Sequence, residues 1–466
     1  MVVGEIPVQA DFLVLGGGPG GYTAALRAAE LGRRVMLVDR DGVDGLGGVC
    51  LRAGCIPSKA LLDAAATVRS LSEMAVAGVR ASGVSFDMGV WQQSKADIVD
   101  GLAGDLLRLM HAGQIDVIEG IGQLSRPDQL VVRSAIDPMA PSQFFQFRDL
   151  LLATGSRPTT LAGFTVDGES VLDSSSALML AAVPASVAVI GGGYIGVELG
   201  TALAKLGSAV TIVEYADRLL PGLDAMFASP VLKGLRALGV DVRLGAAADA
   251  FHDGCLHGRH GDTPFALAVD KVIVAVGRTP NTDSLGLDAA GIAFGADGLI
   301  PVAADRRATR HIAAIGDITH GPALAHKASA EARVAAEALC GLPAAFDPAT
   351  VPAVVFTDPE VATAGLTLRA ARDAGIDAGA MRVPFGASGR AAALHKREGF
   401  LQLVWDRAGQ TVIGTHIVGP HASELIAEAV LAIEMAATLD DVAGAIHAHP
   451  TLGELLGDAA RAAVRS

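Results

Sequence analysis

Two segments with the same internal pattern constrain the fold of this chain more than any other feature. In residues 11–40 and again in residues 186–215, a short apolar run leads into Gly-x-Gly-x-x-Gly, an alanine-containing stretch and a second apolar run that ends at an acidic residue. This order is typical of the strand, glycine turn, helix and strand that open a dinucleotide-binding fold. The repeat therefore predicts an α/β protein with two Rossmann-like domains.

The residue types in this pattern predict how a nucleotide would bind. The first glycine makes a tight turn, the second lets the backbone approach a pyrophosphate, and the third lets the helix pack closely on the strand. The acidic residue accepts hydrogen bonds from a ribose, and its charge disfavours the extra phosphate of NADP, so the second unit is predicted to bind NAD. A single such pattern also occurs where glycines only shape turns, but two in full context favour nucleotide binding. The residues are Gly16, Gly18, Gly21 and Asp39 in the first unit, and Gly191, Gly193, Gly196 and Glu214 in the second.

Three later segments are predicted to be strands that return to these sheets. The first leads to Thr154 and Gly155, the second to Gly277, and the third to Asp317. Because open α/β sheets bind ligands at the carboxyl ends of their strands, the Asp317 carboxylate is expected to accept a hydrogen bond from a cofactor hydroxyl. After about residue 350, short strands followed by helices predict a separate α+β domain.

The spacing of two cysteines suggests redox chemistry. Cα atoms five residues apart on an ideal helix are ~8.6 Å from each other, whereas a disulfide spans about 4.4–6.8 Å. A bridge between Cys50 and Cys55 therefore requires a distorted turn, for which Gly54 supplies backbone freedom, and such a bridge suits a disulfide that opens and closes in turnover. The alternative is a pair of free thiols in a helix. Cys255 and Cys340 are expected to be small buried residues without a role.

Two charged residues form a further hypothesis. Lys59 lies one turn beyond Cys55, where a cation next to a flavin would stabilise negative charge on its reduced form. Glu198, on the predicted helix of the second unit, is placed to hold this lysine. The alternative is an ordinary solvated lysine.

The C-terminal segment contains a candidate acid–base pair. Pro450 disfavours helical geometry at His449 and suits the first position of a helix, so His449 is predicted at the mouth of a helix. An imidazole exchanges a proton with a thiol near neutral pH, and Glu454 would fix its tautomer and raise its basicity. The alternative is a structural or incidental metal-binding His-x-His pair, and His447 has no assigned role.

Composition excludes several function classes. The net charge of -14 and the absence of a basic run argue against nucleic acid as a partner. The N-terminus has no basic region before its short apolar run, so neither a signal peptide nor a membrane span is expected, and a cytoplasmic location is predicted. Four cysteines without paired zinc spacing indicate no metal site.

Six motifs stand out along the chain, namely GGVCLRAGCIPSK, GGGYIGVELG, AVGRTPNT, AIGDI, LAHKASAEA and HAHPTLGE. Together they resemble the dihydrolipoamide dehydrogenase family of class I pyridine nucleotide-disulfide oxidoreductases. The resemblance covers nearly the whole chain, and the histidine motif followed by glutamate separates it from glutathione and mercuric reductases. It implies a flavoprotein that reoxidises dihydrolipoyl groups of a 2-oxo acid dehydrogenase or related complex through the Cys50–Cys55 disulfide and FAD, with hydride transfer to NAD⁺.

The resemblance also implies residue roles. Cys50 would exchange with substrate, Cys55 would contact the flavin as a charge-transfer thiolate, and His449 with Glu454 would act on the disulfide of the other subunit of a homodimer. One tightly bound FAD per subunit and NAD⁺/NADH are the expected cofactors. FAD would lie on Gly16, Gly18, Gly21, Asp39, Lys59, Gly122, Asp317 and Ala325, NAD on Gly191, Gly193, Gly196, Glu214 and Gly277, and Thr154, Gly155 and Glu198 are further predicted cofactor contacts.

Four domains are expected on this basis. Residues 1–157 would bind FAD, 158–281 would bind NAD, 282–351 would return to the FAD domain, and 352–466 would form the dimerisation interface. Because the first strand begins soon after the N-terminus, lipoyl domains are expected on another protein. The resemblance implies that this chain binds those lipoyl domains and the acyltransferase core of a 2-oxo acid dehydrogenase complex.

Some observations leave alternatives open. Val49 stands where the family commonly has threonine, and Arg52-Ala53 replace a common Asn-Val, so the potential of the disulfide is left open. Three rival functions are an NADPH-driven reductase, a flavoprotein oxidase or transhydrogenase without disulfide chemistry, and a redox-inert docking subunit. Glu214 disfavours the NADPH-driven reductase, and the cysteine spacing disfavours the oxidase or transhydrogenase. The presence of all the catalytic residue types disfavours the redox-inert docking subunit. The host complex, whether pyruvate, 2-oxoglutarate, branched-chain, glycine cleavage or acetoin, is not identified.

Overall fold

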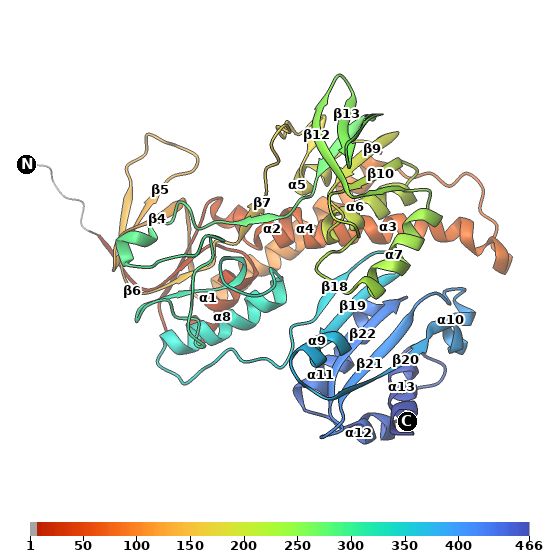
Figure 1. Cartoon of the computed structure of the whole chain (residues 1–466). Coiled ribbons are helices and arrows are strands. Elements are labelled where there is room, and N and C mark those ends of the chain that lie inside the picture. The colour runs from red at the N-terminus through yellow and green to blue at the C-terminus, as the bar shows by residue number, and fades with distance from the viewer. Residues whose placement is uncertain (1–6, 466) are drawn as a thin grey trace, which may run out of the picture. The chain divides into compact units, whose positions relative to one another are not determined.

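The computed structural model describes residues 7–465. Contacts divide the chain into two compact units, and Figure 1 labels many of their elements. The first unit contains residues up to Ala60, 87–159 and 277–347, and the second contains 61–86, 160–276 and the residues from Pro348 onward. The α/β class is confirmed, while the predicted boundaries at residues 157, 281 and 351 stay predictions.

The first unit is built on a seven-stranded sheet. Strands β3, β2, β1 and β6 are parallel neighbours, β17 pairs with β6 in parallel, and β5 and β4 extend the sheet in antiparallel fashion. Phe12, Leu13 and Val14 are completely buried because both faces of the sheet are covered. The strands are β1 (Val8–Leu15), β2 (Val35–Asp39), β3 (Asp116–Glu119), β4 (Ile121–Arg126), β5 (Gln129–Arg133), β6 (Gln143–Leu152) and β17 (Ile312–Ala314), and a small sheet pairs β7 (Ser156–Pro158) with β16 (Arg278–Pro280).

Two alanine-rich helices share one buried cluster with the strands of this sheet. Ala24 and Ala28 of α1 and Ala332 and Ala335 of α8 are completely buried in it, and their small side chains allow close approach of the two backbones. Pro19 opens α1, where a missing N–H costs nothing. The helices are α1 (Pro19–Glu30), α2 (Gly48–Ala53), α3 (Cys55–Glu73), which continues into the second unit, α4 (Met88–Ala112) and α8 (Ala325–Leu339), with 3₁₀ turns η1 (Gly42–Gly45), η3 (Leu287–Ala290) and η4 (Gly316–Ile318).

The second unit contains a five-stranded parallel sheet in the order β11-β10-β9-β15-β8. It repeats the strand, helix and strand of the first unit, as the sequence predicts. A three-stranded antiparallel sheet, β12-β13-β14, lies between β11 and β15 in the chain. The elements are β8 (Val171–Leu172), α5 (Ser174–Ala177), β9 (Ser186–Ile190), α6 (Tyr194–Lys205), β10 (Ala209–Glu214), α7 (Ala225–Ala237), β11 (Asp241–Leu244), β12 (Ala246–His252), β13 (Cys255–His260), β14 (Thr263–Ala268) and β15 (Lys271–Val274), with η2 (Met74–Ala77) earlier in the chain.

The C-terminal part of the second unit is an antiparallel sheet in the order β18-β19-β22-β21-β20, with helices that share its buried cluster. This arrangement confirms the predicted α+β content, while its being a separate domain stays a prediction. Among residues 7–465, no helix combines the length and apolar character needed to cross a membrane. The elements are β18 (Ala353–Val355), β19 (Glu360–Gly365), α9 (Leu368–Asp373), β20 (Ala378–Pro384), η5 (Phe385–Ala387), α10 (Gly389–Ala393), β21 (Phe400–Asp406), β22 (Val412–Gly419), α11 (Ala422–Glu434), α12 (Leu439–Gly444) and α13 (Glu454–Val464).

Candidate active site

The first glycine pattern forms a turn that only glycine fits. Gly16 has a φ of +107°, and a Cβ there would overlap the carbonyl oxygen of Ala153. A Cβ at Gly21 would overlap the carbonyl of Gly16, so its absence allows α1 to lie close to β1. At Gly18, no described atom lies within 4 Å of the Cβ position. The backbone there faces open space, as a pyrophosphate site requires.

The second pattern reproduces these features one by one. Gly191 has a φ of +109°, with the carbonyl oxygen of Ala275 in the place of a Cβ. Gly196 packs against the carbonyl of Gly191. Gly193 again has no described atom within 4 Å of its Cβ position. Both turns therefore have the shape that fits a dinucleotide.

Three helices begin without a capping side chain at the predicted cofactor positions. These are α1, α6 and α8, which follow Gly18, Gly193 and Leu324, and α8 starts at the predicted contact Ala325. Their first N–H groups and the positive ends of their dipoles can therefore serve a bound anion or carbonyl. Other helices are capped by their own side chains, as Asp87 caps α4, Asp224 caps α7 and Thr367 caps α9.

The two acidic residues at the strand ends bind the glycine turns directly. Asp39 accepts the N–H of Gly17 at 2.7 Å. Glu214 accepts the N–H of Gly192 and, with its other oxygen, that of Ala216 at 2.6 Å. Because a carboxylate oxygen has more than one lone pair, these bonds leave capacity for a ribose hydroxyl. Each acid thus fixes the turn and is placed to bind a nucleotide.

Sequence reasoning assigned no role to Ser156 and Arg278, which lie next to Asp317, whereas the nearby strand end at Thr154 was a predicted cofactor contact. Asp317 lies in η4, just beyond β17, and accepts the Ser156 hydroxyl at 2.5 Å. Arg278 donates through Nε to the same hydroxyl oxygen at 2.7 Å. Thr154 and Asn281 exchange hydrogen bonds of 2.8 and 2.9 Å. The signal was present in GSRP and GRTPN, where polar residues directly follow the strand-end glycines.

Two glycines predicted as cofactor contacts have different surroundings. Gly155 and Gly277 have φ values of +65° and +126°, so both need the freedom of glycine. Gly122 lies on β4, where a Cβ would be 2.7 Å from Leu15 and 2.9 Å from Leu130. Packing alone accounts for this glycine, and its contact with FAD stays a prediction.

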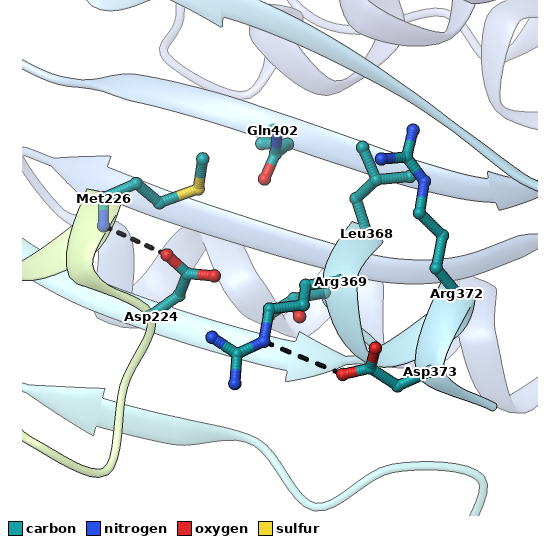
Figure 2. A pocket seen from close by; sticks show the side chains of 8 residues that line it. Asp224, Met226, Leu368, Arg369, Arg372, Asp373 and Gln402 are labelled. Carbon is teal, nitrogen blue, oxygen red and sulfur yellow. Dashed lines mark hydrogen bonds and ion pairs between the residues drawn. The ribbon is translucent and has the colours of Figure 1, made fainter.

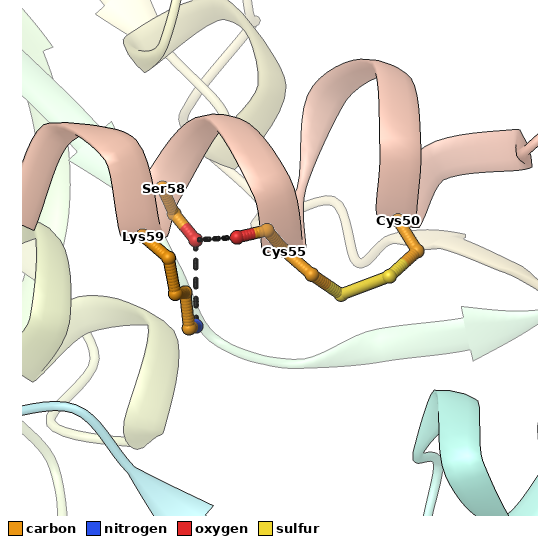
Figure 3. Close-up of a disulfide and its surroundings, with 4 residues drawn as sticks. All are labelled: Cys50, Cys55, Ser58 and Lys59. Carbon is orange, nitrogen blue, oxygen red and sulfur yellow. Dashed lines mark hydrogen bonds between the residues drawn. A yellow bond between two sulfur atoms is a disulfide. The ribbon is translucent and has the colours of Figure 1, made fainter. Parts of the chain in front are cut away.

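The structure forms the predicted disulfide at a break between two helices. Helix α2 ends at Ala53, Gly54 has φ −144° and ψ −109°, and α3 begins at Cys55. This break brings the Cα atoms of Cys50 and Cys55 to 4.6 Å, close enough for the bridge shown in Figure 3. A Cβ at Gly54 would lie 2.8 Å from the carbonyl oxygen of Val49, so a larger residue would disturb the break.

The structure also gives the hydrogen-bond partners of the polar residues near the disulfide and of the predicted partner of Lys59. Lys59 donates to Ser58 Oγ at 3.4 Å, and Ser58 donates to the carbonyl of Cys55 at 3.1 Å (Figure 3). Glu198 on α6 is 4% exposed and accepts the N–H of Phe356 at 3.0 Å. Lys59 and Glu198 belong to different units, so their pairing stays a prediction. Arg52 folds back to the carbonyls of Leu46 and Val43 at 3.1 and 3.4 Å, and thereby anchors η1.

His449 and Glu454 form a hydrogen-bonded pair in which the histidine ring is exposed. His449 Nδ1 lies 2.8 Å from Glu454 Oε1, and 80% of the histidine side chain is exposed. The Thr451 N–H and the His449 ring hold the pKa of Glu454 below its usual value, so this carboxylate is charged throughout the neutral range. With its Nδ1 proton directed to Glu454, the ring presents the lone pair of Nε2 outward for a proton.

The predicted position of the helix start is wrong. Helix α13 begins at Glu454, with Gly453 as its N-cap, rather than at Pro450. The Glu454 carboxylate accepts the N–H of Thr451 at 2.8 Å, and the Thr451 hydroxyl donates to the carbonyl of Ala448 at 2.7 Å. These side-chain bonds close residues 448–453 into a turn before the helix. His447 instead anchors this segment, since its ring nitrogens contact Glu428 at 2.8 Å and the carbonyl of Ala445 at 3.2 Å.

The other two cysteines are not buried as predicted. Cys255 on β13 and Cys340 at the end of α8 are both partly exposed and free. Arg33 Nη1 contacts the sulfur of Cys340 at 3.7 Å, and burial raises the pKa of this thiol despite that cation. A raised pKa disfavours the reactive thiolate.

A separate hollow lies in the second unit, apart from the predicted site residues. It is formed by the start of α7, by α9 and by the centre of β21 (Figure 2). Its lining residues are Asp224, Met226, Thr367, Leu368, Arg369, Arg372, Asp373 and Gln402.

Known proteins are similar to this chain in both sequence and fold. Residues 10–332 match the family described as pyridine nucleotide-disulphide oxidoreductase, and residues 351–460 match its dimerisation domain. The dihydrolipoyl dehydrogenase of Geobacillus stearothermophilus is 44% identical over 470 residues, which cover 100% of this chain and 98% of that protein. The dihydrolipoyl dehydrogenase of Halobacterium salinarum is 43% identical over 472 residues, with 100% and 98% covered.

Solved structures are also similar to this chain over almost its whole length. LpdA from Mycobacterium tuberculosis has a TM-score of 0.89 and 27% identity, over 97% of this chain and 99% of that chain. The HOCl-induced flavoprotein disulfide reductase RclA from Escherichia coli has a TM-score of 0.84 and 27% identity, over the same shares.

Proposed function

The chain belongs to the pyridine nucleotide-disulphide oxidoreductase family, and on this basis we propose that it oxidises dihydrolipoyl groups with NAD⁺ as the final acceptor. The observation that carries the proposal is the Cys50–Cys55 disulfide at the helix break. The paired His449 and Glu454 add the acid–base group that thiol exchange needs. The most direct test is reduction of the purified protein by dihydrolipoamide.

The cysteines would perform two successive exchanges. One substrate thiolate attacks Sγ of Cys50, the Cys50–Cys55 bond breaks, and Cys55 leaves as a thiolate. The second substrate thiol then attacks the substrate sulfur in this mixed disulfide and releases the Cys50 thiolate. The substrate leaves as a cyclic disulfide, so two electrons pass to the protein. His449 Nε2 accepts the proton of the attacking substrate thiol, while Glu454 holds the ring through Nδ1.

The glycine turns fit the two cofactors that the family uses. When bound, FAD and NAD⁺ supply the two-electron carriers that the protein thiols lack. Gly18 and Asp39 would bind the phosphates and ribose of FAD, with the start of α8 and Asp317 at the other end of the molecule. Gly193 and Glu214 would bind NAD in the corresponding way.

A homodimer agrees with both sequence and structure. Residues 351–460 match the dimerisation domain of the family. Large apolar side chains are exposed in the same region, namely Leu431 at 63%, Met435 at 73% and Ile446 at 100%. Such side chains favour burial against another protein surface. We propose that His449 of each subunit serves the disulfide of the other.

The partner and the location are also proposals. Lipoyl domains and the acyltransferase core of a 2-oxo acid dehydrogenase or related complex would supply the dithiol, because the relatives act on dihydrolipoyl groups by name. We place this reaction in the cytoplasm. The residues at the site favour no particular host complex, since the lipoyl group is common to all of them.

Glu214 should set the choice of nucleotide. Glu214→Gln keeps the size and one acceptor oxygen, gives up one of the two bonds to the N–H groups of Gly192 and Ala216, and removes the charge that repels a 2′-phosphate. We expect the ratio of kcat/KM for NAD⁺ to that for NADP⁺ to fall about tenfold, which corresponds to about 1.4 kcal/mol. Steady-state assays with each nucleotide and a fixed dihydrolipoamide concentration measure it.

Asp241→Asn is the matched control. Asp241 opens the neighbouring strand β11, at the end of the sheet opposite Glu214, and half of its side chain is exposed. Asp241→Asn removes one negative charge, as Glu214→Gln does, and should leave the ratio of kcat/KM for NAD⁺ to that for NADP⁺ unchanged. An unchanged ratio in Glu214→Gln, or an equal change in both variants, would contradict the role of Glu214.

A further inference from the structure

Helix α8 contains two charged side chains that are almost completely buried. Lys327 is 2% exposed and Glu331 is 0% exposed. They lie one turn apart, and Lys327 Nζ is 3.3 Å from Glu331 Oε1. Arg306, with 13% of its side chain exposed, adds a bond of 3.0 Å from Nη1 to the same oxygen. Charges are buried in this way only when the surrounding groups compensate their loss of hydration.

Both members of the α8 pair hold the backbone of one residue. Glu331 Oε2 accepts the N–H of Gly316 at 2.7 Å. Lys327 Nζ donates to the carbonyl of Gly316 at 3.0 Å and contacts Thr319 Oγ1 at 3.3 Å. Gly316 has a φ of +74°, and Asp317 follows it directly. The buried pair therefore holds the turn that contains Asp317 against α8, the helix whose first residue is Ala325.

The buried trio also has an unequal charge. Lys327 and Arg306 supply two cations, whereas Glu331 supplies one carboxylate. Arg306 Nε has no hydrogen-bond partner among residues 7–465, and within the same residues the ion pair of this arginine is the one with Glu331. A buried positive charge stabilises nearby negative charge more strongly than an exposed one, because the local dielectric constant is low.

We propose that Lys327, Glu331 and Arg306 are positioning residues for the flavin. They hold Asp317 and the N-terminus of α8 in a fixed position relative to each other. Their net positive charge favours the negatively charged, reduced form of the bound flavin. This inference rests on the proposed binding of FAD. It assigns a function to a motif, LAHKASAEA, whose charged residues touch neither the disulfide nor the glycine turns.

Lys327→Met tests the positioning role. The substitution keeps an unbranched side chain that is one heavy atom shorter, and removes its charge and its bonds to Gly316 and Thr319. We expect the purified holoprotein to release FAD about tenfold faster on dilution, which the fluorescence of free flavin measures, and the reduction potential of the bound flavin to become more negative. The matched control is Arg333→Met, which removes a cation from an exposed position of the same helix and should change neither value.

Lys327→Gln separates the two effects. A glutamine amide can donate to the Gly316 carbonyl without a charge. We expect FAD release close to that of the wild type, together with the more negative potential. A potential and a release rate equal to those of Arg333→Met in both Lys327 variants would overturn the proposal. So would loss of the fold in both, as judged by circular dichroism, because the pair would then determine the fold rather than the flavin site.

The outcomes also separate this inference from the proposed function. If the wild-type protein purifies without flavin and does not take up added FAD, the proposed function fails. If the wild type holds flavin and both Lys327 variants hold it with the same potential and release it at the same rate as Arg333→Met, only the positioning role fails. A folded Lys327→Met protein that is recovered without flavin supports the positioning role.

Discussion

Cys50→Ser is expected to lower turnover with dihydrolipoamide and NAD⁺ by about 10³-fold or more. The substituted hydroxyl cannot form the bridge to Cys55, and serine is a far weaker nucleophile and leaving group than a thiolate at neutral pH. The loss should affect kcat rather than the binding of either cofactor, because Cys50 lies outside both glycine turns. Steady-state kinetics and the flavin content of the variant measure the two effects separately.

Cys255→Ser is the matched control for this result. Cys255 is a partly exposed free thiol on β13, so its substitution changes the same atom without touching the disulfide. It should leave turnover at the wild-type level. Substantial turnover in Cys50→Ser would refute the disulfide mechanism and favour direct reduction of the flavin.

His449→Gln is expected to slow the reduction of the disulfide by dihydrolipoamide by about 10²- to 10³-fold. The substitution keeps a polar side chain near Glu454 but removes the nitrogen that accepts the thiol proton. Stopped-flow mixing under anaerobic conditions measures this half-reaction directly. Glu454→Gln should give a smaller loss, of about tenfold, since the ring remains while the charged partner that orients it is lost.

His447→Gln distinguishes catalysis from support of the loop. His447 anchors the same segment through Glu428 and Ala445, and only 9% of its side chain is exposed. We expect its reduction rate to stay close to that of the wild type. If His449→Gln matches the wild type, or if His447→Gln is equally slow, then His449 is not the base.

The sequence predicted the parts of the site whose chemistry is encoded locally. The glycines at Gly16 and Gly191 are needed because of the positive φ of their turns, and the acids Asp39 and Glu214 follow from the ends of the next strands. The need for a distorted turn at Gly54 came from the distance that a disulfide tolerates, and the structure places a helix break there.

Features that depend on distant partners were not predictable in this way. The burial of Lys327 and Glu331 depends on Gly316 and Arg306, which are separated from α8 in the sequence. An alanine-rich stretch with alternating charges has the composition of an exposed helix, and only the tertiary structure buries its charged face. The start of α13 was misplaced for a related reason, because the bonds made by Glu454 could not be inferred from Pro450.

The central claim is that dihydrolipoyl groups deliver electrons through the Cys50–Cys55 disulfide to NAD⁺. Anaerobic titration of the purified flavoprotein with dihydrolipoamide, followed by addition of NAD⁺, tests it most directly. We expect the flavin spectrum to change in proportion to the dithiol added, two cysteine thiols to become titratable, and NADH to form when NAD⁺ is supplied. No change with dihydrolipoamide, together with bleaching of the flavin by NADPH, would contradict the claim and indicate a reductase that works in the opposite direction.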